Sequence, residues 1–135
     1  LMDTGGNSGS QSSVTVIRSL SLGEIEFSDL WAVIWKEIRV GALCGVSLAA
    51  VNFIKIWLVD KLLLGHDITL MVDLVVCATS AAVVVFAKTV GAMLPLLMEK
   101  LGFDPAVMAS PFISTVMDAM SLLIYFLFAH LLLGI

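Results

Sequence analysis

Three long apolar stretches constrain the fold of this chain more than any other feature of its sequence. They cover residues 40–64, 69–98 and 106–133, and each exceeds the roughly 20 residues that an α-helix needs to cross a bilayer. Hydrophobic residues make up 60% of the chain and charged residues 13%, against about 45–50% and about 25% in a soluble domain. A soluble helical bundle is the alternative, but this composition favours an all-α, polytopic membrane domain.

The charged and sulfur-containing residues argue against several other classes. The net charge is −4 and no basic stretch is present, so we expect no nucleic-acid partner. Cys44 and Cys77 lie inside apolar runs without metal-ligand spacing, and we interpret both as small core residues. The sequence opens at Leu1, in the middle of a motif and without an initiator Met, so we expect a fragment of a longer chain.

Two shorter segments precede the apolar stretches. Residues 1–22 begin Gly/Ser-rich and continue with a helical pattern, which predicts the end of a membrane helix. Its glycines would allow close packing or an unwound turn that binds a cation, and a flexible linker is the alternative. Residues 28–39 combine an apolar helical face with Trp31 and Trp35, which is typical of an amphipathic interfacial helix that Ser28 could cap.

Small and polar residues inside the spans predict where helices meet. Gly41 and Gly45 are four residues apart and predict close packing against another helix. Lys88 lies well inside its span, where a lysine either snorkels to the interface or pairs with another helix. Asp104 and Pro105 predict the start of the last helix, with Asp104 as its cap.

Asp118 is the single acidic residue of the last span. Ser114, Asp118, Ser121 and Tyr125 follow one another at separations of 4, 3 and 4 residues, which places them on one stripe of a helix. A charged group in hydrocarbon costs at least a few kcal/mol, so an intramembrane carboxylate indicates a functional role. A structural hydrogen-bond acceptor between helices is the alternative for Asp118.

The oxygen-bearing residues point to a hard cation. The Asp118 carboxylate, the hydroxyl groups of Ser114 and Thr115 and the Gly/Asn/Gln segment near the N-terminus are ligands that suit Mg²⁺ or Ca²⁺ rather than soft metals. One carboxylate per chain makes a weak site, whereas a symmetric dimer would supply two. Two close carboxylates repel each other in an apolar wall, and a divalent cation removes that repulsion. We therefore expect a preference for divalent over monovalent ions.

Two protease patterns are weaker alternatives. Residues 6–9 match the G-x-S-G pattern of rhomboid-type intramembrane serine proteases, in which Ser8 would need a base such as His130. An aspartyl protease would need two facing carboxylates, and Asp73 and Asp118 qualify by residue type alone. The first match is short and the second lacks its motif, so we expect no catalytic residues and no enzyme.

Several short motifs carry a family resemblance by their order along the chain. They are Gly5–Ser13, Leu22–Glu24, Lys36–Gly41, Gly91–Pro95, Leu101–Pro105, Pro111–Asp118 and Leu122–Phe126. Together they resemble the transmembrane domain of the MgtE magnesium transporters over essentially the whole chain. The resemblance implies five membrane helices per subunit and a homodimer, with the ion pore along the dimer axis and the second and fifth helices lining it.

The resemblance also implies roles for individual residues. Asp118 would be the central pore carboxylate that binds hydrated Mg²⁺, and the backbone around Gly6 and Asn7 would form the opposing wall. The expected metal-binding residue is thus Asp118. The expected pore-lining residues are Gly6, Asn7, Gly9, Gln11, Ser114, Thr115 and Ser121.

From these patterns we predict a channel or transporter in which the membrane potential drives Mg²⁺ inward through a homodimer pore. The family resemblance implies that Mn²⁺ and Co²⁺ also pass. It further implies that the chain lacks a first membrane helix, a cytoplasmic N-domain and paired CBS domains. We expect a multi-pass protein of the inner membrane, and Arg18, Arg39 and Lys100 outnumber Lys61, which predicts a C-terminus outside. A non-conducting assembly domain in which Asp118 holds helices together is the competing hypothesis.

Overall fold

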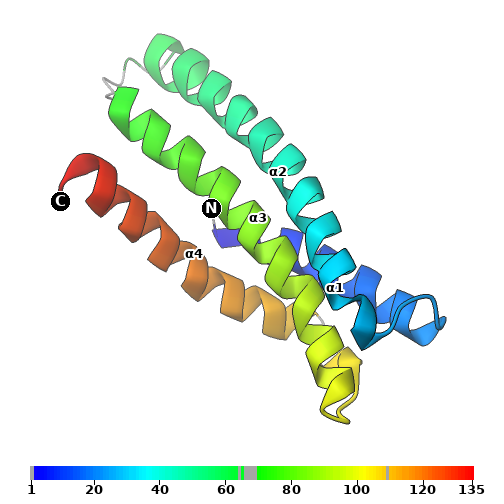
Figure 1. Ribbon diagram of the computed structural model, residues 1–135. Coiled ribbons are helices and arrows are strands. Elements are labelled where there is room, and N and C mark those ends of the chain that lie inside the picture. The colour runs from blue at the N-terminus through cyan, green and yellow to red at the C-terminus, as the bar shows by residue number, and fades with distance from the viewer. Residues whose placement is uncertain (1, 64, 66–69, 109) are drawn as a thin grey trace.

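The computed structural model describes residues 2–63, 65, 70–108 and 110–135, and these residues form helices joined by turns, with no strand among them (Figure 1). The prediction of an all-α membrane domain is confirmed. The long helices are α1 (Met2–Ser21), α2 (Leu30–Lys55), α3 (Leu70–Lys100) and α4 (Ser110–Leu133). Short helices are the 3₁₀ turns η1 (Phe27–Asp29) and η3 (Pro105–Met108), and the π-helical segment η2 (Ile56–Leu63) that continues α2.

Three stretches of the described chain are long and apolar enough to cross a membrane. They are Phe27–Val59, Leu70–Lys100 and Pro111–Leu133, with mean hydropathies of 1.9, 2.3 and 2.0. Large apolar side chains such as Leu43 and Phe126 are exposed on the outside of the bundle. An apolar exterior of this extent suits contact with lipid rather than with water.

The helix α3 is the centre of the bundle. It packs against α2 on one side and α4 on the other, and α1 crosses it on the face turned away from the viewer (Figure 1). The helix α1 also packs against α4, so it contacts two of the three spans closely. This arrangement brings the Gly/Ser-rich segment of the sequence into the interior of the bundle.

Small residues set the distance between α2 and α3. A Cβ atom added at Gly41 would lie 2.9 Å from the Cα atom of Val85, and one added at Gly45 would lie 2.8 Å from the carbonyl oxygen of Ala81. Neither backbone could move aside without shifting its helix. The predicted packing role of Gly41 and Gly45 is confirmed.

Glycine closes α1 and α3 in the same way. Gly23 has φ +71° and Gly102 has φ +82°, a left-handed conformation that is accessible to glycine at little cost. After α1, the Gly23 N–H donates to the Leu20 carbonyl oxygen at 3.1 Å and the Glu24 N–H donates to the Ser19 carbonyl oxygen at 2.9 Å. This Schellman pairing satisfies carbonyl groups that the helix end would leave open.

The start of α2 differs from the sequence-based expectation. The amphipathic helix expected at 28–39 and the described part of the span expected at 40–64 form one continuous helical run from α2 into η2, because no proline separates them, and Leu64 lies outside the described residues. Ser28 lies within η1 and does not cap α2. Asp29 precedes the helix instead, and its Oδ2 atom accepts a hydrogen bond of 2.9 Å from the Glu26 N–H.

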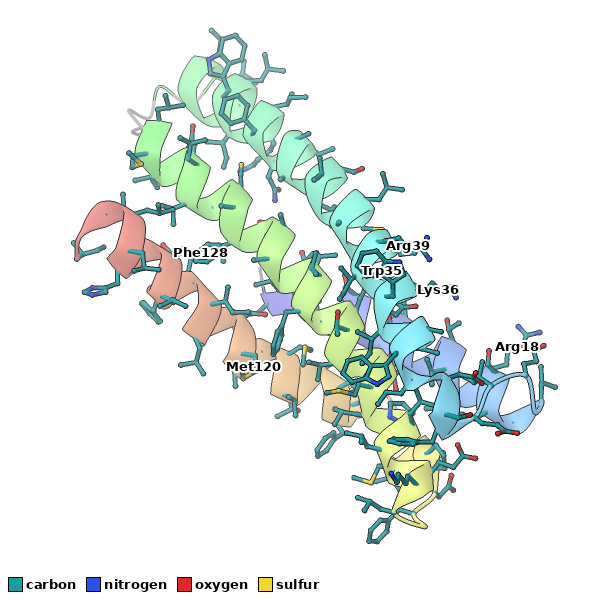
Figure 2. The ribbon with its side chains drawn as sticks, in the orientation of Figure 1. Arg18, Trp35, Lys36, Arg39, Met120 and Phe128 are labelled. Carbon is teal, nitrogen blue, oxygen red and sulfur yellow. The ribbon has the colours of Figure 1, made fainter. Side chains whose placement is uncertain are left out.

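Aromatic and basic residues gather on the outer face of the first turns of α2. Trp31 and Trp35 are exposed, and the Arg39 guanidinium lies 5.8 Å from the centre of the Trp35 ring (Figure 2). Trp and Arg in this combination are typical of a membrane interface. At the next loop, the Asp104 Oδ1 atom accepts a 3.0 Å hydrogen bond from the Ala106 N–H, so Asp104 caps η3 just ahead of α4.

Candidate functional site

Glycine residues of α1 lie close to α4. Gly5, Gly6 and Gly9 are buried, and a Cβ atom added at Gly6 would lie 3.4 Å from the Ser114 Oγ atom of α4. At Gly5 the added atom would lie 2.7 Å from the Ser121 Oγ atom. At Gly5 and Gly9 a larger side chain would push the two helices apart, because a Cβ atom at Gly9 would also lie 2.9 Å from the Ile113 Cγ2 atom, so these glycines hold the backbone of α1 next to α4.

The serine residues of α4 meet α1 as its helical stripe predicts. The Oγ atoms of Ser114 and Ser10 are 3.4 Å apart. Ser121 is 1% exposed, and its Oγ atom has no hydrogen-bond partner among the described residues. The contact surface between α1 and α4 is therefore polar at Ser114 and contains an unsatisfied hydroxyl group at Ser121.

Asp118 lies at the edge of this contact surface. It follows Ser114 by four residues and Thr115 by three, and it is half-buried, whereas Thr115 is exposed. The structure gives the Asp118 carboxylate no hydrogen-bond or ion-pair partner within the described part of the chain. The Thr115 hydroxyl group donates to the Pro111 carbonyl oxygen of its own helix at 3.0 Å. Thr115 is thus exposed on α4, and Asp118 is only partly covered by the helices of its own chain.

A second carboxylate that the sequence analysis missed lies near this site. Asp3, in the first turn of α1, lines a cavity of about 380 Å³ together with Ser121 and Tyr125 of α4. The position of Asp3 could have been predicted from the sequence, because Asp3 precedes Gly6 by three residues and Ser10 by seven. That spacing places Asp3 on the stripe of α1 that faces α4.

Two expected pore residues lie on another side of α1. Asn7 and Gln11 are exposed and face a groove of about 540 Å³ between α1 and α2. Further residues that line this groove are Thr4, Ser8, Leu43, Cys44, Ser47, Leu48 and Lys88. Within one chain, Gly6 and Gly9 therefore lie near α4, whereas Asn7 and Gln11 do not. Adjacent residues differ by about 100° around a helix, so Gly6 and Asn7 face different neighbours.

The backbone of α1 is regular through its glycines. Residues Met2–Ser21 form one α-helix, so neither a flexible linker nor an unwound turn occurs at Gly6. Its carbonyl groups accept intrahelical hydrogen bonds and retain one lone pair each for a water molecule. Contact of this backbone with an ion would therefore run through water.

The donor set of one chain suits weak binding of a hydrated cation. Among the described residues, no three His, Cys, Asp or Glu side chains gather in a way that could hold a metal ion. Asp118, Asp3 and nearby hydroxyl groups are hard oxygen donors, which a cation that keeps its water shell can contact indirectly. In the protease alternative His130 would activate Ser8, but its Nδ1 atom lies 2.6 Å from the Ile135 carbonyl oxygen at the C-terminus.

Comparison with known proteins gives a consistent picture. The MgtE family model, described as divalent cation transporter, matches residues 1–128. The magnesium transporter MgtE of Thermus thermophilus is 40% identical over 133 residues, which are 98% of this chain and 28% of that protein. Those of Enterococcus faecalis and Bacillus subtilis are 33% and 34% identical over 125 residues each, covering 91% and 90% of this chain.

The chain spans between 25% and 28% of the length of these relatives. The relatives are named as transporters rather than as enzymes, and the long apolar helices of the present chain agree with a membrane protein. Since the family model covers nearly the whole sequence, the chain belongs to the MgtE family of divalent cation transporters.

Proposed function

We propose that this chain forms the ion-conducting membrane part of a transporter that carries Mg²⁺ into the cell. The family and the names of three relatives support transport of a divalent cation, and of Mg²⁺ in particular. The observation that carries the proposal is the half-buried Asp118 carboxylate, which lies in a membrane span without a partner among the described residues. An isolated carboxylate in hydrocarbon is costly, and a passing cation would compensate it.

The proposed site is completed by a second copy of the chain. Thr115 is exposed and Asp118 is half-buried, so a symmetric partner could present the same two residues to the same ion. Two carboxylates match the charge of a divalent ion, and their repulsion in its absence disfavours occupancy by a monovalent ion. The proposed ion site therefore requires a homodimer.

In the proposed pathway the ion keeps its water shell. Mg²⁺ loses water reluctantly and prefers octahedral geometry, so Asp118 would bind it through water molecules. The buried Ser121, Gly6 and Gly9 would hold α1 against α4 behind the site, whereas Ser114, which is only partly buried, would hydrogen-bond to the same water shell. Such contact is weak enough for the ion to move on, which conduction requires. We leave Asn7 and Gln11 out of the pathway because they face the groove on the other side of α1.

The membrane potential is a sufficient driving force for this flux. It contributes about 2.3 kcal/mol per elementary charge per 100 mV, and so about twice that for a divalent ion. Arg18, Lys36, Arg39 and Lys100 lie at the same end of the bundle, which supports a cytoplasmic location for that end by the positive-inside rule. The C-terminus would then be outside an inner membrane.

Further parts of the whole protein are also proposals. The relatives are longer than this chain, which leaves room for a first membrane helix and for cytoplasmic N and CBS domains. Such domains would supply the regulation that the membrane part does not explain. Mn²⁺ and Co²⁺ are also divalent and bind oxygen ligands, and we propose that they pass through the same site.

The proposal is tested by Mg²⁺ uptake into liposomes that contain the full-length protein with Asp118→Asn or Asp118→Ala. We expect each variant to lose at least about tenfold in uptake, because removing the carboxylate charge from an ion site within the membrane costs on the order of 1.4 kcal/mol or more. The matched control is Glu99→Gln, an exposed carboxylate in the last turn of α3. If the Asp118 variants remain folded dimers and transport like the wild type, the chain is better described as a non-conducting assembly domain.

A further inference from the structure

Three polar side chains from three helices meet in the interior of the bundle. The Ser12 hydroxyl group of α1 donates a 2.7 Å hydrogen bond to the Glu37 Oε2 atom of α2. The Lys88 Nζ atom of α3 donates to the Ser12 Oγ atom at 3.3 Å and lies 3.9 Å from the same Glu37 oxygen. The side chains of Lys88 and Glu37 are 11% and 7% exposed, so the two charges compensate each other away from solvent.

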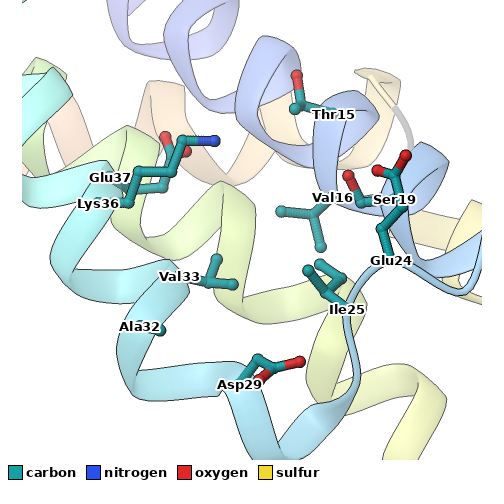
Figure 3. A pocket seen from close by; sticks show the side chains of 10 residues that line it. All are labelled: Thr15, Val16, Ser19, Glu24, Ile25, Asp29, Ala32, Val33, Lys36 and Glu37. Atoms are coloured by element: carbon teal, nitrogen blue, oxygen red, sulfur yellow. The ribbon is translucent and has the colours of Figure 1, made fainter.

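This cluster of Ser12, Glu37 and Lys88 separates two cavities along α1. Lys88 lines the groove of about 540 Å³ that also contains Asn7 and Gln11. Glu37 lines a second cavity of about 320 Å³ toward the loop between α1 and α2 (Figure 3). Further residues of this loop-side cavity are Thr15, Val16, Ser19, Glu24, Ile25, Asp29, Ala32, Val33 and Lys36.

The two cavities follow one polar stripe of α1. Thr4, Ser8 and Gln11 face the groove, and Thr15 and Ser19 face the loop-side cavity. These residues are separated by four, three, four and four positions, which is the spacing of one helix face. At about 1.5 Å per residue the stripe extends over about 22 Å, a large part of a hydrocarbon core of about 30 Å. The cluster interrupts it near its middle.

We propose that Ser12, Glu37 and Lys88 form a charge-paired seal that closes this second polar path to cations. The Lys88 ammonium group faces the groove and repels cations that enter it, as fixed positive charges do in other selective pores. Glu37 compensates that charge, and Ser12 holds the carboxylate in place from α1. The seal confines cation flux to the α4 side of α1, where Asp3 and Asp118 lie.

The inference rests on the proposed function and predicts opposite results for the two charged residues. Lys88→Ala leaves the Glu37 carboxylate alone in the path, so the path becomes attractive to cations. We expect a several-fold increase in Na⁺ leak into Mg²⁺-free liposomes that contain the full-length protein. Glu37→Gln leaves the Lys88 charge in place, so Na⁺ leak stays at the wild-type level. A merely structural role of the pair would make both variants behave alike.

Two further variants separate the seal from folding defects. Lys88→Gln keeps a long polar side chain but removes the charge, so it is expected to give the same increase in Na⁺ leak. It serves as the test variant if Lys88→Ala does not fold. Lys36→Ala removes an exposed lysine next to Glu37 and is the matched control, with no leak expected. The thermal midpoint of each detergent-purified variant shows whether the leak comes from folded protein.

The Asp118→Ala background distinguishes this inference from the proposed pore site. We expect Lys88→Ala to leak Na⁺ in that background as well, because its path runs along the other face of α1. If Asp118→Ala abolishes the leak, the cluster does not guard a separate path and the inference fails. It also fails if folded Lys88→Ala and Lys88→Gln proteins leak no more than the wild type. Wild-type Mg²⁺ uptake in Asp118→Ala would instead contradict the proposed pore site alone.

Discussion

The two sides of α1 differ in their packing and in the sign of the nearest charge. On the α4 side, Gly5, Gly6 and Gly9 bring the backbones together, and the nearby charges are the carboxylates of Asp3 and Asp118. On the α2 side, hydroxyl and amide side chains line an open groove whose charged residue is a lysine. The α2 side contains more polar side chains, yet its charge disfavours a cation. Side-chain polarity alone therefore does not single out the proposed ion path, whereas the sign of the nearest fixed charge distinguishes the two sides.

Gly91→Ala should have the largest effect, because it would break the contact that fixes the rotation of α1. An added Cβ atom at Gly91 would lie 2.9 Å from both the Cα atom and the carbonyl carbon of Gly9. Backbone atoms of a helix cannot yield alone, so we expect a loss of about 1–3 kcal/mol or complete misfolding. The measurement is the thermal midpoint and monodispersity of the purified full-length protein.

The control for Gly91→Ala is Ser47→Ala, at an exposed helical position whose hydroxyl group bonds only to its own helix at Leu43. We expect this variant to match the wild type. If Gly91→Ala also matches the wild type, the close contact of α1 and α3 does not determine which sides of α1 face α2 and α4.

A comparison of Gly5→Ala with Gly6→Ala tests the α4 side at finer scale. At Gly5 a Cβ atom would lie 2.7 Å from the Ser121 Oγ atom and 2.8 Å from the Val83 Cγ1 atom, whereas at Gly6 the nearest atom is 3.4 Å away. We expect Gly5→Ala to lower stability by about 1–2 kcal/mol. Gly6→Ala should be neutral or stabilising, because alanine gains about 1 kcal/mol in a helix. Equal thermal midpoints for the two variants would contradict the packing described for α1 and α4.

Asp3→Asn should have an intermediate effect on transport. Asp3 is exposed and lines the cavity beside Ser121, so its charge would concentrate cations near the site rather than bind them tightly. We expect Mg²⁺ uptake to fall about two- to fivefold at low ionic strength and by less at high ionic strength, where exposed charges are screened. A loss that does not depend on salt would argue against this electrostatic role.

Asn7→Ala should have the smallest effect. Asn7 faces the groove on the α2 side, so its removal should leave Mg²⁺ uptake within about twofold of the wild type, a change smaller than one good hydrogen bond provides. If Mg²⁺ uptake instead falls as far as it does in Asp118→Asn, Asn7 lines the pore. In that case the two sides of α1 would not differ in function as we propose.

Much of the fold follows from the sequence because its determinants are local. The apolar stretch 69–98 corresponds to α3 at Leu70–Lys100, and the spacing of Gly41 and Gly45 identified a packing surface. The spacing of the polar residues in the last span also identified a stripe before its neighbour was known. Such features depend on length, propensity and periodicity, all of which can be read from one chain.

The sequence does not show which helix packs against each polar stripe, because that depends on long-range contacts. Gly6 and Asn7 are adjacent in sequence, but the rotation of α1 between α3 and α4 decides which of them approaches α4. Lys88 was expected either to snorkel or to pair, and its partners Ser12 and Glu37 come from helices whose contacts are long-range. Asp3 was missed because the glycine and amide residues that follow it dominate the pattern of this segment, although it lies on the same stripe.

The contact between Gly9 and Gly91 has a kinematic consequence. With no side chains between them, the two backbones have no soft layer along which to slide, and the cluster at Ser12 and Lys88 joins the same helices one turn away. The helices α1 and α3 should therefore move as one rigid body. Gly41 and Gly45 hold α2 against the backbone of α3 in the same way. Any opening or closing of the bundle would then be taken up at α4, whose contacts with α1 include the side chains of Ser114, Ser121 and Ile113, and a pair of spectroscopic labels on α1 and α4 would record the change in distance.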